Sequence, residues 1–205
     1  KVGLTTLGSE IPILELVQGA YDAMSKNSSL EVVLIGPKIE THLDLYEADD
    51  EDRVRNILGD LLDQEVIDGA VTMHYPFPIG VATVGKVITP ARGKVMYIAT
   101  TTGTSDTNRI QAMVKNAVFG IATAKADGIK DPTVGILNVE GARQVERYLT
   151  NMYNNGYNFT WGQSKRIDGG QILRGNDLIL GSVDVLVTDT LTGNILMKLF
   201  SSFNS

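Results

Sequence analysis

The densest group of polar side chains lies in one short stretch near the carboxyl end of the sequence. Residues 188–198 follow an apolar segment, and Lys198 comes one helical turn after Asn194. A strand-to-helix turn of this kind can hold an anion, because hydroxyls, a carboxamide and the first N–H groups of a helix all donate hydrogen bonds. In the plainer alternative, Thr192 caps the helix and Lys198 lies in solvent. The catalytic or binding candidates are Asp189, Thr192, Gly193, Asn194 and Lys198.

A second hydroxyl-rich segment, residues 100–109, lies between an apolar run and a long helical pattern. Its glycine allows the backbone to approach a ligand closely, and the helix start offers N–H groups and the positive end of a dipole. The alternative is that Ser105, Asp106 or Thr107 caps the helix, and no Walker-type lysine follows the glycine. The phosphate-binding candidates of this segment are Thr102, Gly103, Thr104 and Ser105.

Two further residues are candidates for the wall of the same site. His74 lies in an aromatic and proline-rich loop after a strand-like run, although a lone histidine often has a structural role. Arg143 follows a glycine after another strand-like run, and a guanidinium binds phosphate through paired hydrogen bonds unless it is engaged in a surface ion pair. With two histidines and no cysteine, the sequence favours no metal site and no bound cofactor.

Composition excludes several classes of function. A net charge of −6 with scattered Lys and Arg argues against a nucleic-acid partner. Neither a G-x-G-x-x-G turn after the first strand nor a G-x-S-x-G motif is present, which disfavours NAD chemistry and a serine hydrolase. Because the chain has no cysteine, thioester chemistry needs the sulfur of a partner. The absence of a signal-peptide pattern and of a long apolar run predicts a cytoplasmic protein with no membrane partner.

Strand-like and helical patterns alternate along the whole chain, and the elements position the candidate turns. This alternation predicts an α/β fold with a largely parallel sheet and helices on both faces, a three-layer α/β/α arrangement whose ligands bind beyond the carboxyl ends of the strands. The predicted strands are residues 2–5, 31–35, 69–72, 95–99, 133–137 and 183–187, and the predicted helices are residues 12–25, 50–64, 107–126, 142–155 and 193–200.

Long stretches of the sequence resemble one superfamily. Residues 4–10, 33–36, 135–139, 184–189 and 192–198 are similar to the phosphate acyltransferases of bacterial phospholipid synthesis. Residues 71–81, 99–105, 135–147 and 187–194 are more similar to a branch of that superfamily, the component C alpha subunits of glycine/sarcosine/betaine reductase complexes. The resemblance implies the isocitrate/isopropylmalate dehydrogenase-like fold of phosphotransacetylases, which often form homodimers.

The resemblance also implies an activity. Component C holds the two-carbon product of amine reduction as an acetyl thioester and releases it with inorganic phosphate, the substrate, as acetyl phosphate. Its implied partners are the component C beta subunit that carries the acyl thioester and the selenoprotein component. The asparagine and lysine of the family's Gly-Asn-hydrophobic-hydrophobic-hydrophobic-Lys pattern correspond to Asn194 and Lys198, which we expect to serve as oxyanion donor and charge compensation.

Departures from the phospholipid enzymes leave two alternatives open. The lysine-containing stretch of those enzymes is replaced here by residues 140–143, and their small loop is replaced by residues 74–77, so an acyl carrier protein substrate is disfavoured. A non-catalytic subunit that binds a thiol-bearing partner is the other alternative. Residues 1–205 are expected to form a single α/β acyltransferase-like domain, a fragment that lacks an N-terminal extension and a glycine-rich C-terminal part.

Overall fold

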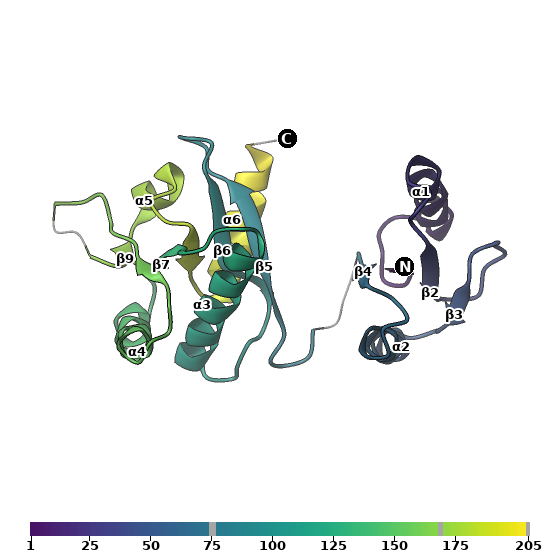
Figure 1. Ribbon diagram of the computed structural model, residues 1–205, viewed down its shortest axis with the longest axis horizontal. Helices are drawn as coiled ribbons and strands as arrows, with labels where there is room; N and C mark the ends of the chain where they lie inside the picture. Colours follow the sequence, from purple (N-terminus) through teal and green to yellow (C-terminus); the bar gives the residue numbers. More distant parts are fainter. Residues whose placement is uncertain (74–76, 168–169, 204–205) are drawn as a thin grey trace. The chain divides into compact units, whose positions relative to one another are not determined.

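The computed structural model describes residues 1–73, 77–167 and 170–203. The chain divides into two compact units, Lys1–Pro76 and Phe77–Ser205, and each has its own sheet (Figure 1). The prediction of a single α/β domain over residues 1–205 stays a prediction, and the two units are described separately below. None of the helices in the described ranges combines the length and the apolar character that a membrane-spanning helix needs.

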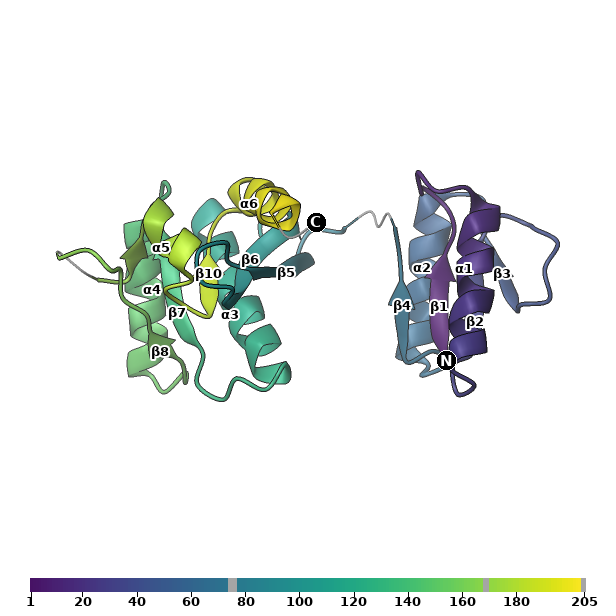
Figure 2. The same cartoon turned by 90° about the horizontal axis from the view of Figure 1, so that it is seen from above.

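Unit 1 is a four-stranded, fully parallel sheet in the order β3-β2-β1-β4. Helices α1 and α2 lie on opposite faces of the sheet, because the side chains of β2 alternate between two apolar clusters (Figure 2). Val33 and Ile35 pack with α2, whereas Val32 and Leu34 pack with α1. The elements are β1 Val2–Thr5, α1 Ile13–Lys26, β2 Val32–Gly36, β3 Leu45–Glu47, α2 Glu51–Asp63 and β4 Gly69–Val71.

Unit 2 is a larger sheet in the order β5-β6-β10-β7-β8, with β9 also paired to β7. Every pair is parallel except β5–β6, which is antiparallel and lies at one edge. The strands are β5 Ala82–Ile88, β6 Val95–Gly103, β7 Thr133–Leu137, β8 Thr160–Trp161, β9 Ile172–Leu173 and β10 Val185–Val187. The helices are α3 Arg109–Ala126, α4 Ala142–Asn154, α5 Gly175–Leu180 and α6 Thr190–Ser202.

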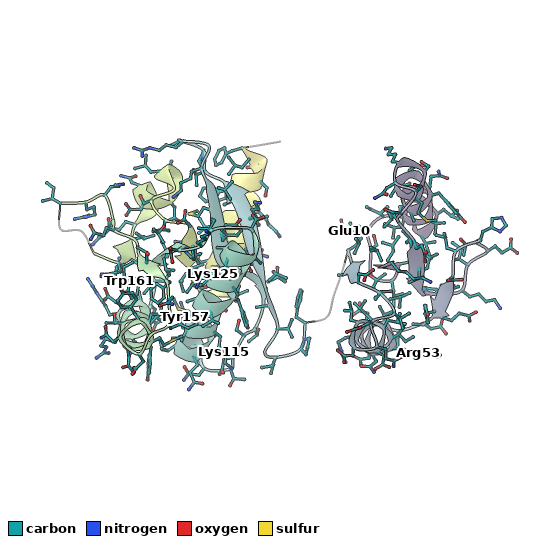
Figure 3. All side chains as sticks on the ribbon, in the orientation of Figure 1. Glu10, Arg53, Lys115, Lys125, Tyr157 and Trp161 are labelled. Atoms are coloured by element: carbon teal, nitrogen blue, oxygen red, sulfur yellow. The ribbon has the colours of Figure 1, made fainter. Side chains whose placement is uncertain are left out.

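The core of unit 2 lies on both faces of β6, β7 and β10. Val185 and Val187 pack against α3 and α4, and Leu186 between them packs against α5 and α6. On the α3 side, Lys125, which is labelled in Figure 3, donates to the carbonyl of Asn158. Each unit therefore has the predicted three layers around a largely parallel sheet.

Two parts of the prediction were wrong in detail. β6 does not end at Ala99 but continues through Gly103, because Thr102 and Gly103 pair with Thr83 and Ala82 of β5. Five elements that the sequence did not predict are β3, β5, β8, β9 and α5, which are short or, for β5, interrupted by a glycine.

Candidate functional site

The carboxyl ends of β6, β7 and β10 lie at one edge of the unit 2 sheet, because the three strands are parallel neighbours. The turn from β10 into α6 is at the centre of this edge. Ligands of open α/β sheets bind beyond these strand ends. The structure therefore brings the predicted residues of the β10–α6 turn to the edge where a ligand is expected.

Asp189 caps α6 in this turn. Its Oδ1 accepts from the backbone N–H of Thr192 at 3.1 Å, and its Oδ2 accepts from the Thr192 hydroxyl at 2.8 Å. The alternative in which Thr192 is the cap is therefore wrong. These bonds fix the first turn of the helix, and the catalytic role of Asp189 and the binding role of Thr192 stay predictions.

Gly193 lies where α6 crosses the end of β6. A Cβ on this residue would overlap the backbone carbonyl oxygen of Thr100, so glycine permits the close approach of the helix and the strand. The N–H of Gly193 donates to the carbonyl of Asp189 at 2.9 Å. The structure thus gives Gly193 a packing role, and its predicted role as a backbone donor to a ligand requires this N–H to leave Asp189.

Asn194 and Lys198 follow on α6. The Asn194 carboxamide donates through Nδ2 to the carbonyl of Thr101 at 2.9 Å, which holds it against the end of β6. Its second N–H and its Oδ1 have no hydrogen-bond partner among the described residues. Lys198 is exposed, and no ion pair links it to any residue that the structure describes. The asparagine is therefore a fixed donor, while the lysine extends into solvent.

Buried hydroxyl groups surround the same turn. Thr188 is fully buried and its Oγ1 has no partner among the residues that the structure describes, although its backbone carbonyl accepts from Asn116 Nδ2 at 3.1 Å. The hydroxyls of Thr100 and Thr190 lie 3.2 Å apart. A buried hydroxyl without a hydrogen bond costs free energy, so Thr188 is a destabilising polar group directly before this turn.

The second predicted segment is divided between strand and loop. Thr102 and Thr104 are exposed at the end of β6 and just after it, and Gly103 has a positive φ of 90°. Ser105 is buried, and its hydroxyl donates to Oδ1 of Asn116. Thr102, Gly103 and Thr104 thus remain accessible to a ligand, whereas the Ser105 hydroxyl is already used; the phosphate-binding roles of all four stay predictions.

The start of α3 also differs from the expectation. Asn108 is the cap, and its side chain accepts from the N–H groups of Ile110 and Gln111. Ser105, Asp106 and Thr107 do not cap the helix. Asp106 instead accepts from Lys115, a residue labelled in Figure 3, at 2.6 Å, and this hydrogen bond lowers the pKa of the Asp106 carboxyl.

Two residues that contact the β10–α6 turn were not among the predicted site residues. Asn116 links Ser105 to the carbonyl of Thr188, and its signal was a polar residue on the apolar face of α3. Arg109 approaches Asp189 with its Nη2 at 3.4 Å from Oδ2. No pattern in the sequence marks this contact, since it depends on how two turns meet at the edge of the sheet.

The remaining candidates lie at or beyond the margin of this edge. Arg143 is on α4, where it lines a cavity of about 580 Å³ and pairs with Glu146 at 3.0 Å. His74 lies outside the described residues. Within the described residues, no group of three or more His, Asp or Glu side chains is arranged to hold a metal ion.

Comparison with known proteins gives the family. Residues 1–178 match the family described as "Fatty acid synthesis protein". Over its whole length the chain is 55% identical to the glycine/sarcosine/betaine reductase complex component C subunit alpha of Peptoclostridium acidaminophilum, of which it spans 53%. It is 25% identical to a phosphate acyltransferase of Thermotoga neapolitana, with 97% of the chain and 68% of that protein covered.

A solved structure confirms the fold. A branched-chain phosphotransacylase from Enterococcus faecalis V583 matches with a TM-score of 0.64 at 17% identity, covering 98% of the chain and 84% of that protein. The resemblance inferred from the sequence is likewise confirmed by the full-length match to a component C alpha subunit. The chain spans about half the length of that relative, and it belongs to the family described as "Fatty acid synthesis protein".

Proposed function

We propose that this protein takes part in acyl transfer from a thioester to inorganic phosphate. Relatives named as phosphate acyltransferases and a fold neighbour named as a phosphotransacylase support this class of reaction. The similarity to a component C alpha subunit supports a narrower proposal, in which the acyl group is acetyl and the product is acetyl phosphate within a glycine, sarcosine or betaine reductase complex.

The observation that carries the proposal is the anchored carboxamide of Asn194. One N–H of its Nδ2 is held by the Thr101 carbonyl, so the other N–H has a fixed direction. A donor that is already oriented stabilises a developing oxyanion without reorganising during the reaction. The positive N-terminal end of α6 and the exposed Lys198 further on add positive potential at this edge.

In the proposed step, a phosphate oxygen attacks the thioester carbonyl carbon and forms the new C–O bond. The C–S bond then breaks, and the sulfur leaves as a thiolate that takes up a proton. Residues 1–205 contain no cysteine, so the thiol lies outside them. Our proposal is that the component C beta subunit carries it and that the selenoprotein component is the source of the two-carbon unit. Residues of the β10–α6 turn hold the carbonyl oxygen in position for attack by the phosphate.

The test is arsenate-dependent breakdown of acetyl phosphate by the full-length natural protein, alone and with its thiol-bearing partner. Asn194→Ala should lower the rate by about 100-fold, as expected for loss of one oxyanion donor. Asn56→Ala is the matched control, because Asn56 is an exposed helical asparagine of unit 1. Equal rates in both variants would exclude the Asn194 site.

Two other outcomes separate the alternatives. Turnover of long-chain acyl phosphate in preference to acetyl phosphate would favour an acyltransferase that uses acyl carrier protein. No turnover even with the partner present, but stable association with it, would favour the non-catalytic subunit.

A further inference from the structure

Arg109 is the first residue of α3, and its side chain is 48% exposed. It is held by two long contacts: Nη2 lies 3.4 Å from Oδ2 of Asp189, and Nε donates to the carbonyl of Glu140 at 3.4 Å. A well-formed bond between a guanidinium and a carboxylate measures about 2.7–2.9 Å. Asp189 is already engaged with Thr192 through both oxygens. The guanidinium, with five N–H donors, therefore keeps most of its hydrogen-bonding capacity.

The cavity beside Arg109 is lined by three arginines. It has a volume of about 580 Å³, lies where the β7–α4 turn meets the start of α3, and its lining includes Arg109, Arg143, Arg147 and the single carboxylate of Glu140. Arg143 pairs with Glu146, whereas Arg147 has no ion pair among the described residues. In a protein with a net charge of −6, this local excess of positive charge favours an anionic ligand.

The backbone that lines the cavity also presents hydrogen-bond donors. Gly141 precedes α4 in the left-handed conformation, with φ at 85°, and no side chain caps the helix. The N–H groups of Glu140, Gly141 and Arg143 have no partner among the described residues. A Cβ on Gly141 would overlap Ile110 of α3, so the glycine also brings the start of α4 close to Arg109.

From the three arginines around one cavity and the loosely held guanidinium, we propose that this cavity binds the phosphoryl group of the substrate or product. Arg109 is its main cation, and it exchanges its contact with Asp189 for the phosphate oxygens. Arg143 and Arg147 contribute from α4. The identity of the anion rests on the proposed function, whereas the location of the cavity does not. The cavity lies on the α3–α4 side of Asp189, and its residue Arg109 contacts the turn that carries Asn194.

The test is a titration of the full-length protein, followed by phosphorus NMR, with inorganic phosphate in one arm and acetyl phosphate in the other. The arm with the lower Kd identifies which phosphoryl group the cavity prefers. Arg109→Gln should raise that Kd at least about tenfold, since it removes charge-assisted, paired hydrogen bonds. The matched control is Arg92→Gln, because Arg92 is exposed in the β5–β6 turn of the same unit. Equal Kd values for these two variants would overturn the proposal.

A second variant changes the Kd in the opposite direction. Asp189→Asn keeps an oxygen that caps α6 but removes the charge that competes for Arg109, so phosphate should bind about threefold more tightly. Weaker binding in Asp189→Asn would contradict the proposed exchange. Arg109→Lys keeps the positive charge but loses the paired N–H donors of the guanidinium, so its Kd should lie between those of the wild type and Arg109→Gln. If Arg109→Gln fails to fold, Arg109→Lys takes its place in the test.

The phosphate titration and the acyl transfer assay together distinguish a failure of the cavity proposal from a failure of the proposed function. Phosphate binding that depends on Arg109, in a protein with no acyl transfer, would support the cavity and exclude the reaction. Acyl transfer that depends on Asn194, with phosphate binding that ignores Arg109, would support the reaction and exclude the cavity as the phosphate site.

Discussion

The β10–α6 turn of unit 2 and the β1–α1 turn of unit 1 are built alike. Each follows a central strand of a parallel sheet, and each leads into a helix of 13 or 14 residues. At or just after the end of each strand there are buried threonine hydroxyls that have no partner within the described part of the chain, Thr188 in unit 2 and Thr5 and Thr6 in unit 1. By position in the fold alone, either turn qualifies as a ligand site.

The two turns differ in where their polar contacts come from. In the β1–α1 turn the side-chain contacts are local, since Ser9 accepts from the N–H of Ile11 and Pro12 gives α1 no side-chain cap. In the β10–α6 turn they come from β6 and α3 through Thr101, Asn116 and Arg109. A side chain that is held by hydrogen bonds to separate elements has a fixed orientation, and catalysis requires reacting groups to be oriented in this way. This difference is the reason why we place the proposed site in unit 2.

The largest expected difference between the two helices concerns their glycines. Gly193→Ala should cost about 3 kcal/mol or more, because the new methyl group meets a strand carbonyl that cannot move. Gly19→Ala in α1 meets no atom within 4 Å and should stabilise unit 1 by about 1 kcal/mol. Urea unfolding followed by circular dichroism measures both. A neutral Gly193→Ala would show that the helix and strand can separate without cost.

The next largest difference in stability is expected between a buried carboxylate of unit 2 and an exposed carboxylate of unit 1. Asp177 of α5 is 2% exposed, and it accepts from the N–H groups of Lys165 and Arg174 and from the hydroxyls of Ser164 and Ser182. Asp177→Ala should cost about 3 kcal/mol because these donors lose their acceptor. Asp50→Ala, which removes the exposed cap of α2, should cost about 1 kcal/mol. Similar losses from the two substitutions in urea unfolding would contradict this ranking.

Asp177 also predicts a pH dependence. Burial raises the pKa of this carboxyl, but its backbone and hydroxyl donors outweigh that effect and lower the pKa overall. Its stabilisation is therefore complete above the unfolded pKa of about 3.9 and is lost as the pH falls through the lower folded value. Asp177→Asn should show a smaller decline in unfolding free energy than the wild type between pH 5 and the acid transition, about pH 3. An unchanged decline would assign the acid sensitivity to other carboxylates.

The smallest expected effect distinguishes the two turns most directly. Thr188→Val and Thr5→Val each remove a buried hydroxyl without a partner, so each should stabilise its unit by about 1 kcal/mol. Only Thr188→Val should also weaken acyl transfer, because only that hydroxyl lies at the proposed site. Loss of activity in Thr5→Val, with Thr188→Val unaffected, would move the site to unit 1.

Local patterns were sufficient to predict most of the fold. The apolar spacing of α4 predicted its start at Ala142 and its end to within one residue, and β1 and β7 were predicted with the bounds that the structure has. β5 was missed because Gly85 interrupts its pattern. That glycine is required by a tertiary contact, since a Cβ there would overlap Thr101 and Met197, and such contacts leave no local signal.

For the candidate site, the sequence indicated which turns lie at the carboxyl ends of the strands, and the functional roles of their residues stay predictions. The crowding of polar residues at 188–198 indicated the β10–α6 turn, but the sequence did not distinguish Asn194, which is anchored, from Gly193, whose N–H is used within the helix. The contact of Arg109 with Asp189 could not be predicted from the sequence for a related reason. Its role depends on the meeting of the starts of α3, α4 and α6, which lie far apart in the sequence.

The aromatic packing beside β8 has an optical consequence. Trp161 is the single tryptophan of the chain, and its ring meets that of Phe159 edge-on with centroids 5.0 Å apart. Its fluorescence therefore reports on unit 2 alone, whereas far-ultraviolet circular dichroism reports on the helices of both units. Coincident unfolding curves from the two signals would mean that the units melt as one cooperative body, and separated curves would measure the stability of each.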